Sequence, residues 1–210
     1  IAHIAIDRAH TTASDIASYF PLTAIMKLAE AGYIGSVSPR FYGLPTNRSQ
    51  RTTRDIDSAA LLAYCREDNV DAMVLVPNCP VCHQSVAIAA HCLESAGIAT
   101  VIMGCARDIT EYVGVPRLLF SDLPLGNAAG LPHDPDSQNL VTQLALDLLV
   151  DATQPRTTRQ SPLIWSGAPD WKKDYSNAAL LSAEEIAERR AEFDRVKAAA
   201  AAIKSASKTD

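Results

Sequence analysis

The run Asp71-Ala72-Met73-Val74-Leu75-Val76-Pro77 decides the fold class of this chain. It is apolar without polar alternation and ends at a proline, a pattern typical of a strand buried on both faces of a parallel sheet. Apolar residues at helical spacing follow from about Val81 to Ala96, and Gly97 closes that segment. A second apolar run, Thr100-Val101-Ile102-Met103, comes next. This order predicts two parallel strands joined by a right-handed helical crossover.

The same alternation continues in both directions along the chain. Gly32 and Asp55 provide expected helix caps, the first at a C-terminus and the second at an N-terminus. The further elements expected are helices at about 22–31, 55–66 and 139–151 and short strands at 34–37 and 117–120. Together they predict an α/β fold with an open, doubly wound, mostly parallel sheet of the flavodoxin or Rossmann-like kind. Ligands of such sheets bind beyond the carboxyl ends of the strands.

Composition divides the chain into three parts. Residues 1–152 form the expected α/β domain, and residues 153–181 lack a clear period and are interpreted as an irregular linker or arm. Residues 182–210 are expected to form a charged, alanine-rich C-terminal helix and tail. Ser182 and Glu185 have the spacing of a capping box at its start.

The overall composition indicates a reduced, cytoplasmic protein. The 210 residues are 48% hydrophobic and 20% charged, with a net charge of −5 and no basic stripe, which argues against nucleic-acid or anionic-membrane partners. No apolar run approaches the ~20 residues needed to cross a bilayer, and the first residues do not resemble a secretory signal. Five cysteines are an odd number for a disulfide framework, so free thiols are expected.

The motif Cys79-Pro80-Val81-Cys82 is the predicted active centre. Pro80 suits the first helical position, which makes Cys79 the expected N-cap. The unpaired N–H groups and positive dipole end of a helix favour a thiolate there. Cys82 lies one helical turn further on and can resolve a mixed disulfide, while His83 can donate or accept a proton.

Two other interpretations of the cysteines stay open. A Cys-x-x-Cys pair can be half of a zinc site, but no second pair stands at suitable spacing, so no metal site is expected. The pair can also be a small buried apolar filler. Cys65 and Cys92 lie among alanines and leucines in the middle of predicted helices, and we interpret both as core residues.

Polar residues follow the other strands where ligands would collect, and we predict four of them as substrate-binding residues: Cys105, Arg107, Asp122 and Asn127. Arg107 could clamp a carboxylate with its planar guanidinium, or form a surface pair with Asp108. Cys105 could be a third redox thiol or a packed sulfur. Asn127 lies between two glycines that allow close backbone approach, although the segment could also be a plain turn.

The sequence around the dithiol resembles selenoprotein B of the glycine, sarcosine, betaine and D-proline reductases. The likeness covers about residues 16–132 and is most similar to the short subunit of the D-proline reductase type. Its motifs are Phe20-Pro21-Leu22, the stretch 31–39, the stretch 71–85, the stretch 93–100, Pro116-Arg117 and Pro124-Leu125-Gly126-Asn127-Ala128-Ala129-Gly130. Cys79 stands where that family has selenocysteine, and sulfur is the weaker nucleophile and poorer leaving group.

The resemblance implies a reductive cleavage at the α-carbon of a small amino acid or related amine. Cys79 would be the nucleophile and Cys82 the resolving thiol, with a dithiol as reductant. It also implies a second subunit of a reductase complex that carries a pyruvoyl group, and an oligomer. No cofactor is expected in this chain. The alternatives are a non-catalytic scaffold of the same fold and a general thiol-disulfide oxidoreductase.

Overall fold

The computed structural model describes residues 6–46, 48–165, 169–174, 181–188, 190–191, 194–195 and 198. Its helical elements are η1 (Ile16–Ser18), α1 (Leu22–Glu30), α2 (Gln50–Thr52), η2 (Thr53–Asp57), α3 (Ser58–Glu67), α4 (Pro80–Ser95), α5 (Arg107–Val113), α6 (Pro135–Asp151) and η3 (Pro169–Asp174).

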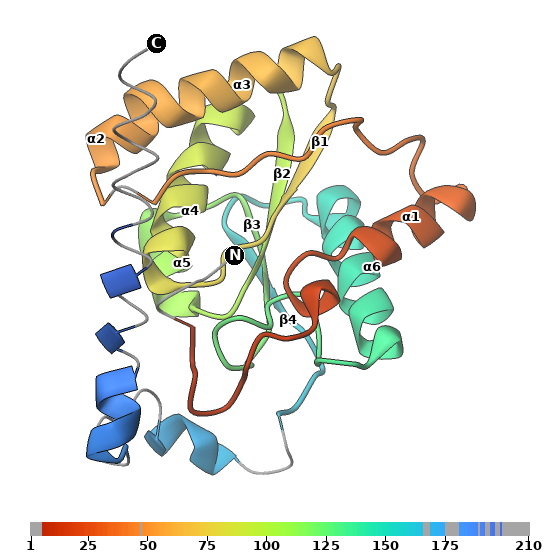
Figure 1. Ribbon diagram of the computed structural model, residues 1–210. Coiled ribbons are helices and arrows are strands. Elements are labelled where there is room, and N and C mark those ends of the chain that lie inside the picture. The colour runs from red at the N-terminus through yellow and green to blue at the C-terminus, as the bar shows by residue number, and fades with distance from the viewer. Residues whose placement is uncertain are drawn as a thin grey trace.

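The described part of the chain contains one sheet of four parallel strands. The strands β1 (Ala72–Leu75), β2 (Ala99–Gly104), β3 (Arg117–Phe120) and β4 (Thr157–Gln160) lie in the order β1-β2-β3-β4. Every neighbouring pair is parallel, and helices cover both faces of the sheet (Figure 1). The predicted α/β class with an open parallel sheet is therefore confirmed.

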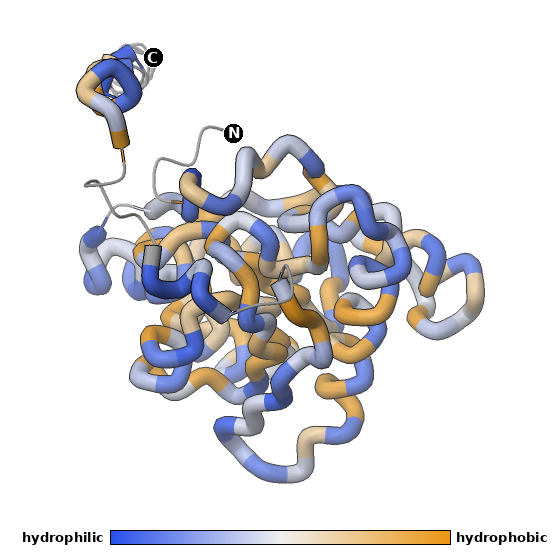
Figure 2. The backbone as a smooth tube through the Cα atoms, turned by 90° about the horizontal axis from the view of Figure 1, so that it is seen from below, coloured by the Kyte–Doolittle hydropathy of each residue, from blue (hydrophilic) through white to orange (hydrophobic). Residues whose placement is uncertain are grey.

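Successive residues of the central strands contribute to two different cores. Ile102 and Leu118 pack with Val86 and Ala90 of α4 on one face, whereas Met103 on the other face packs with α6. Side chains alternate between the faces because the strand repeat is two residues. Full burial of an apolar side chain of this size stabilises the folded state by about 1.5–3 kcal/mol. Viewed from below, the central segments are mostly hydrophobic and the periphery is mostly hydrophilic (Figure 2).

The strand connections do not all have the same hand. α4 packs on α5 and shares its core, while α6 packs on β2 and β3 from the opposite face. Each new strand nevertheless adds on the same side of the previous one. The connection from β3 through α6 to β4 therefore has the opposite hand to the first two, which departs from the expected uniform right-handed crossovers.

Several predicted elements agree closely with the structure. The helices expected at 22–31 and about 81–96 are α1 and α4, and the strand expected at 117–120 is β3. Gly32 and Gly97 follow α1 and α4 with φ of 74° and 88°, the left-handed conformation that ends many helices. The Ser182 and Glu185 capping box is also present, with both reciprocal hydrogen bonds formed.

Other predictions need correction. The stretch 34–37 contains no strand. β1 was expected to be buried on both faces, but it is an edge strand in which only Leu75 is buried. The helix expected to begin at Asp55 begins at Gln50, because the Ser49 hydroxyl accepts a hydrogen bond from the Thr52 N–H and caps it. α6 likewise begins at Pro135 instead of residue 139, with Asp134 as its capping residue.

The segment interpreted as an irregular linker contributes to the sheet. β4 lies within residues 153–181 and pairs with β3 over four positions, so the boundary expected at residue 152 falls before the last strand. Its sequence, Thr157-Thr158-Arg159-Gln160, is polar because β4 is an edge strand with partly exposed side chains. Residues 199–210 of the expected C-terminal tail lie outside the described residues.

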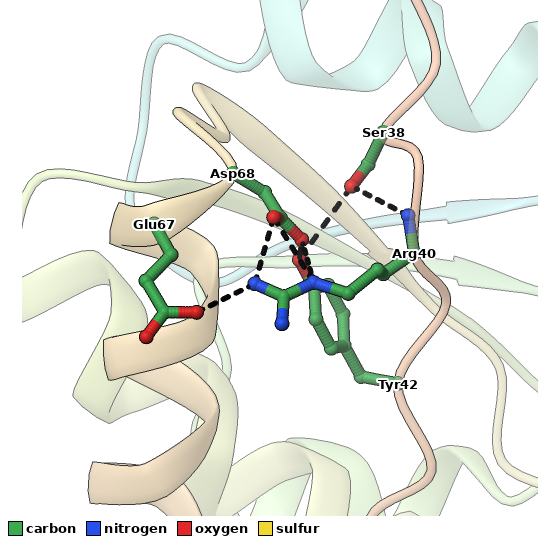
Figure 3. A network of polar contacts seen from close by, with 5 residues as sticks. All are labelled: Ser38, Arg40, Tyr42, Glu67 and Asp68. Carbon is green, nitrogen blue, oxygen red and sulfur yellow. Dashed lines mark hydrogen bonds and ion pairs between the residues drawn. The ribbon is translucent and has the colours of Figure 1, made fainter.

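A polar network attaches the long segment after α1 to the far end of α3 (Figure 3). The Arg40 guanidinium donates to Asp68 at 2.7–3.0 Å and to Glu67 at 2.8 Å, and it stacks over the ring of Tyr64. The hydroxyl of Tyr42 also donates to Asp68. β1 begins just after Asp68, so this network lies at the amino ends of the strands, opposite the dithiol.

None of the helices in the described part of the chain combines the length and the apolar character that a bilayer crossing requires.

Candidate active site

The dithiol lies where several segments gather beyond the carboxyl ends of the strands. The turns after β1 and β2 meet there, together with the loop 121–130 after β3 (Figure 1). The N-terminal segment 6–20 joins that loop through hydrogen bonds from the Asp7 N–H to the Leu125 carbonyl and from the Ala129 N–H to the Ser18 carbonyl. The N-terminal segment and the loop after β3 therefore meet at the end of the sheet where the dithiol lies.

Cys79 is the N-cap of α4, as predicted. Its backbone is extended, with φ of −132° and ψ of 165°, and Pro80 occupies the first turn. The Cys79 sulfur accepts a hydrogen bond from the Cys82 N–H at 3.2 Å. A sulfur that accepts an orphan N–H at the positive end of a helix is stabilised in its thiolate form.

Cys82 has the complementary role in the pair. Its thiol hydrogen bonds to the Cys79 sulfur, and this bond, together with burial and the negative charge of a Cys79 thiolate, raises the pKa of Cys82 above its ordinary value. Cys82 therefore keeps its proton while Cys79 accepts hydrogen bonds. Cys79 and Cys82 are only 7% and 6% exposed, so large reagents cannot reach either sulfur in this conformation.

His83 joins the two neighbouring turns. One ring nitrogen, Nδ1, lies 2.8 Å from the Cys79 carbonyl oxygen, and the other, Nε2, lies 3.0 Å from the Cys105 N–H nitrogen and 3.1 Å from that of Ala106. Because Nε2 faces two donors it must accept, so the proton is on Nδ1, which donates to the carbonyl. Burial lowers the pKa of His83, which keeps the ring neutral.

The His83 ring fits because Gly104 ends β2 without a side chain. A Cβ on Gly104 would lie 3.2 Å from two atoms of the imidazole, so the ring would have to shift by a few tenths of an ångström. His83 itself is fully buried. With both nitrogens bound to backbone groups, the imidazole holds the Cys79 and Cys105 turns at a fixed spacing, a role that the sequence motif did not indicate.

The remaining cysteines are free and separate from the pair. Burial raises the pKa of the Cys105 thiol to about 12, and Cys105 begins the turn that His83 links to Cys79. Cys65 is fully buried in the core between α3 and α4, where burial also raises its pKa. Cys92 lies in α4 and is partly exposed.

The other predicted binding residues make contacts within the protein. Arg107 is half exposed and pairs with Glu111 one turn along α5, rather than with Asp108. Asp122 pairs with Lys172 of η3. The Asn127 side chain is fully buried and holds the loop by accepting from the Thr11 hydroxyl and donating to the Pro124 carbonyl. The structure thus brings Cys79, Cys82, His83 and Cys105 together. The side chains of Arg107, Asp122 and Asn127 instead contact Glu111, Lys172 and the N-terminal segment, respectively.

An Asp–His pair lies in the N-terminal segment at the same end of the sheet. His10 Nδ1 lies 2.8 Å from the carboxylate of Asp7, which is fully buried, and the ring packs edge-on against Trp171. No spacing motif identified this pair in the sequence, because its surroundings come from the loop 121–130 and η3. Among the residues with described positions, no group of three or more His, Cys, Asp or Glu side chains could hold a metal ion.

These features define a class: an α/β protein with a dithiol at the first turn of the helix that follows a parallel strand. No family model matches the chain, and no solved structure does. The chain is similar to the D-proline reductase subunit gamma of Acetoanaerobium sticklandii, with 28% identity over 138 residues. This likeness covers 65% of the chain and 57% of that protein. This similarity confirms the resemblance inferred from the motifs, and the chain spans just over half the length of that subunit.

Proposed function

We propose that this chain is the thiol-bearing subunit of a reductase that cleaves a small amino acid or related amine at its α-carbon. The observation that carries the proposal is the Cys79 and Cys82 pair, in which Cys79 caps α4 and Cys82 retains its proton. The similarity to D-proline reductase subunit gamma supports a reductase type of chemistry. A second subunit is proposed as the partner.

The proposed chemistry has two steps on this chain. The Cys79 thiolate attacks the α-carbon, so that a C–S bond forms and the C–N bond breaks, and the departing nitrogen takes the electron pair and a proton. Cys82 then loses its proton and attacks the Cys79 sulfur. The S–S bond forms, and the carbon leaves with the C–S electron pair and takes a proton. The substrate has gained two electrons, and an external dithiol reduces the Cys79–Cys82 disulfide.

His83 acts in this scheme as a positioning residue. Its ring holds the Cys79 carbonyl against the Cys105 and Ala106 N–H groups, so the capping geometry of Cys79 persists through turnover. We propose Cys105 as the residue beside the dithiol that contacts the substrate. Arg107, Asp122 and Asn127 support the surrounding helix and loops through the contacts described above.

The burial of the pair favours a small substrate over a protein disulfide. A general thiol-disulfide oxidoreductase needs its first sulfur accessible to a protein partner, whereas Cys79 is 7% exposed. A non-catalytic scaffold of this fold would keep the packing without any need for a protonated resolving thiol.

The proposal is tested by measuring dithiol consumption with the candidate partner subunit present and a panel of D-proline, glycine, sarcosine and betaine. Cys79→Ser should abolish substrate-dependent consumption, because a hydroxyl keeps the size and capping ability but is a much weaker nucleophile. Cys82→Ser should allow one attack and then stall, which mass spectrometry would detect as an adduct on Cys79.

Cys92→Ser is the matched control, because Cys92 lies on the same helix and is predicted to have no chemical role. Its turnover should equal that of the wild type. Retained activity in Cys79→Ser would refute the mechanism, and a wild type that turns over no member of the panel would favour the scaffold alternative.

A further inference from the structure

Three buried polar atoms beyond the strand ends have no hydrogen-bond partner among the residues that the structure describes. They are Asn78 Oδ1, Ser121 Oγ and Ser161 Oγ, and their residues are 8%, 0% and 4% exposed. An unpaired buried polar group is costly, and the great majority of such groups are satisfied in folded proteins. Three at one end of one sheet therefore point to a bound group that satisfies them.

The strand register places these residues in a single row. Gly104 pairs with Phe120 and Phe120 with Gln160, so the next positions set Cys105, Ser121 and Ser161 side by side. The ladder continues to this level, because the Ser121 N–H donates to the Gly104 carbonyl and the Ser161 N–H to the Phe120 carbonyl. β1 ends at Leu75, which pairs with Ile102, and Asn78 lies in the turn three residues further on, as Cys105 lies three residues after Ile102.

The contacts of His83 give independent evidence that the turns holding Asn78 and Cys105 are neighbours. Its ring binds the carbonyl of Cys79, the residue after Asn78, and the N–H of Cys105 at the same time. The two turns are therefore no further apart than the width of one imidazole and two hydrogen bonds. The row Asn78, Cys105, Ser121 and Ser161 thus crosses the sheet beside the dithiol.

The row continues the face of the sheet that α6 covers. Val76, Met103 and Leu119 pack in the α6 core, and each lies two residues before the corresponding member of the row. Side chains two residues apart in a strand point to the same face. The row is thus assigned to the α6 side of the sheet. The loop 121–130 leads from β3 toward α6 (Figure 1).

We infer that this row, which we call the polar row, binds the amino and carboxylate groups of a small amino acid. The inference rests on the proposed function and adds a binding site to it. Asn78 Oδ1 can only accept, so the ligand must donate to it, whereas the two serine hydroxyls can both donate to an acceptor. An ammonium group at Asn78 and a carboxylate at the serines satisfy all three atoms.

The spacing of the row selects the size of the ligand. Parallel strands lie about 4.8 Å apart, so Asn78 and Ser121, two strands apart, are separated by roughly 10 Å. Two hydrogen bonds of about 2.9 Å account for roughly 6 Å of that distance. The remaining ~4 Å matches an amino group and a carboxylate on the same or on neighbouring carbon atoms. In this orientation the amino group lies at Asn78, the residue that precedes Cys79 in the chain.

The test measures binding without turnover, using the full chain with Cys79→Ser. Titration calorimetry would use glycine, sarcosine and D-proline, with ethylamine and acetate as probes that carry only one of the two groups. Ser121→Ala and Ser161→Ala should each weaken amino-acid binding roughly tenfold, the effect of losing a charge-assisted hydrogen bond. Asn78→Ala should weaken the binding of ethylamine and leave the binding of acetate unchanged. A bound amino acid should also slow alkylation of Cys105, which lies within the row.

Ser58→Ala is the matched control, because Ser58 is buried but its hydroxyl donates to the Thr53 carbonyl. It should lower the melting temperature without changing binding, whereas the alanine variants of Ser121 and Ser161 should melt no lower than their parent. The proposed binding site would be refuted if no amino acid in the panel binds, or if neither serine variant changes the binding. Binding without dithiol consumption by the complex would reject the proposed function and leave the row standing.

Discussion

Protonation of His83 should couple the stability of the fold to pH. In the folded protein Nε2 accepts from two N–H donors, so a protonated ring would direct a third N–H at them. Burial lowers the pKa of His83 from its ordinary value of 6.5, and it outweighs the opposing effects of the Cys79 carbonyl, the Cys79 charge and Asp108. At acid pH the unfolded chain therefore binds a proton at His83, whereas the folded chain does not.

The size of the effect follows from proton linkage. Above pH 6.5 both states hold neutral His83 and the histidine costs no stability. As the pH falls below that value the unfolded state gains a proton, so the free energy of unfolding decreases by up to about 1.4 kcal/mol per pH unit. If the folded ring stays neutral throughout, the loss at pH 5 is about 2 kcal/mol.

His83→Gln isolates this contribution, because the glutamine oxygen can accept from the same two N–H groups but does not titrate. Urea unfolding at intervals between pH 5 and 8 should show wild-type stability falling toward acid and a flatter profile for the variant. Carboxylates with lowered pKa values, such as Asp15 and Asp68, lose their stabilising effect only as the pH falls below about 4. His91→Gln, at an exposed position of α4, controls for removal of a histidine. Parallel profiles for wild type and His83→Gln would refute the buried neutral assignment.

Two further predictions concern packing and backbone strain. Leu118→Ala should lower the free energy of unfolding by about 2–5 kcal/mol in urea titrations, because Leu118 is fully buried between β2 and α4, whereas Leu140→Ala at a 42% exposed position should cost far less. Gly130→Ala should lower the melting temperature more than Gly97→Ala. Both glycines have positive φ, but the new Cβ at Gly130 would lie 2.8 Å from the Gln138 backbone, while Gly97 has open space. Equal losses for the two glycine variants would contradict this account.

Local sequence patterns were sufficient to predict the elements whose stabilising interactions are local. β3 has the predicted bounds, and α4 begins at Pro80 with Cys79 as its cap, because an N-cap involves only residues within one helical turn. The same local rule failed at the helical segment that begins with α2, since Ser49 and Asp55 are both good capping residues and the helix begins after Ser49.

Elements that depend on distant partners could not be predicted in this way. β4 is four polar residues long, and its strand conformation follows from pairing with β3, about forty residues earlier in the chain. The position of α6 opposite α4 was also open, because both helices have apolar residues for a sheet face and neither pattern identifies the face.

The sequence by itself determined the α/β class and the parallel strands around the dithiol. It also determined that Cys79 caps the helix and that Cys82 follows one turn later. Only the tertiary structure decided how His83 is used, because its partners at Cys105 and Ala106 lie more than twenty residues away. It also decided which polar residues share a row, since Asn78, Ser121 and Ser161 come together only through the register of separate strands. Local motifs depend on contacts within one turn of chain, whereas register and burial depend on how the whole sheet packs.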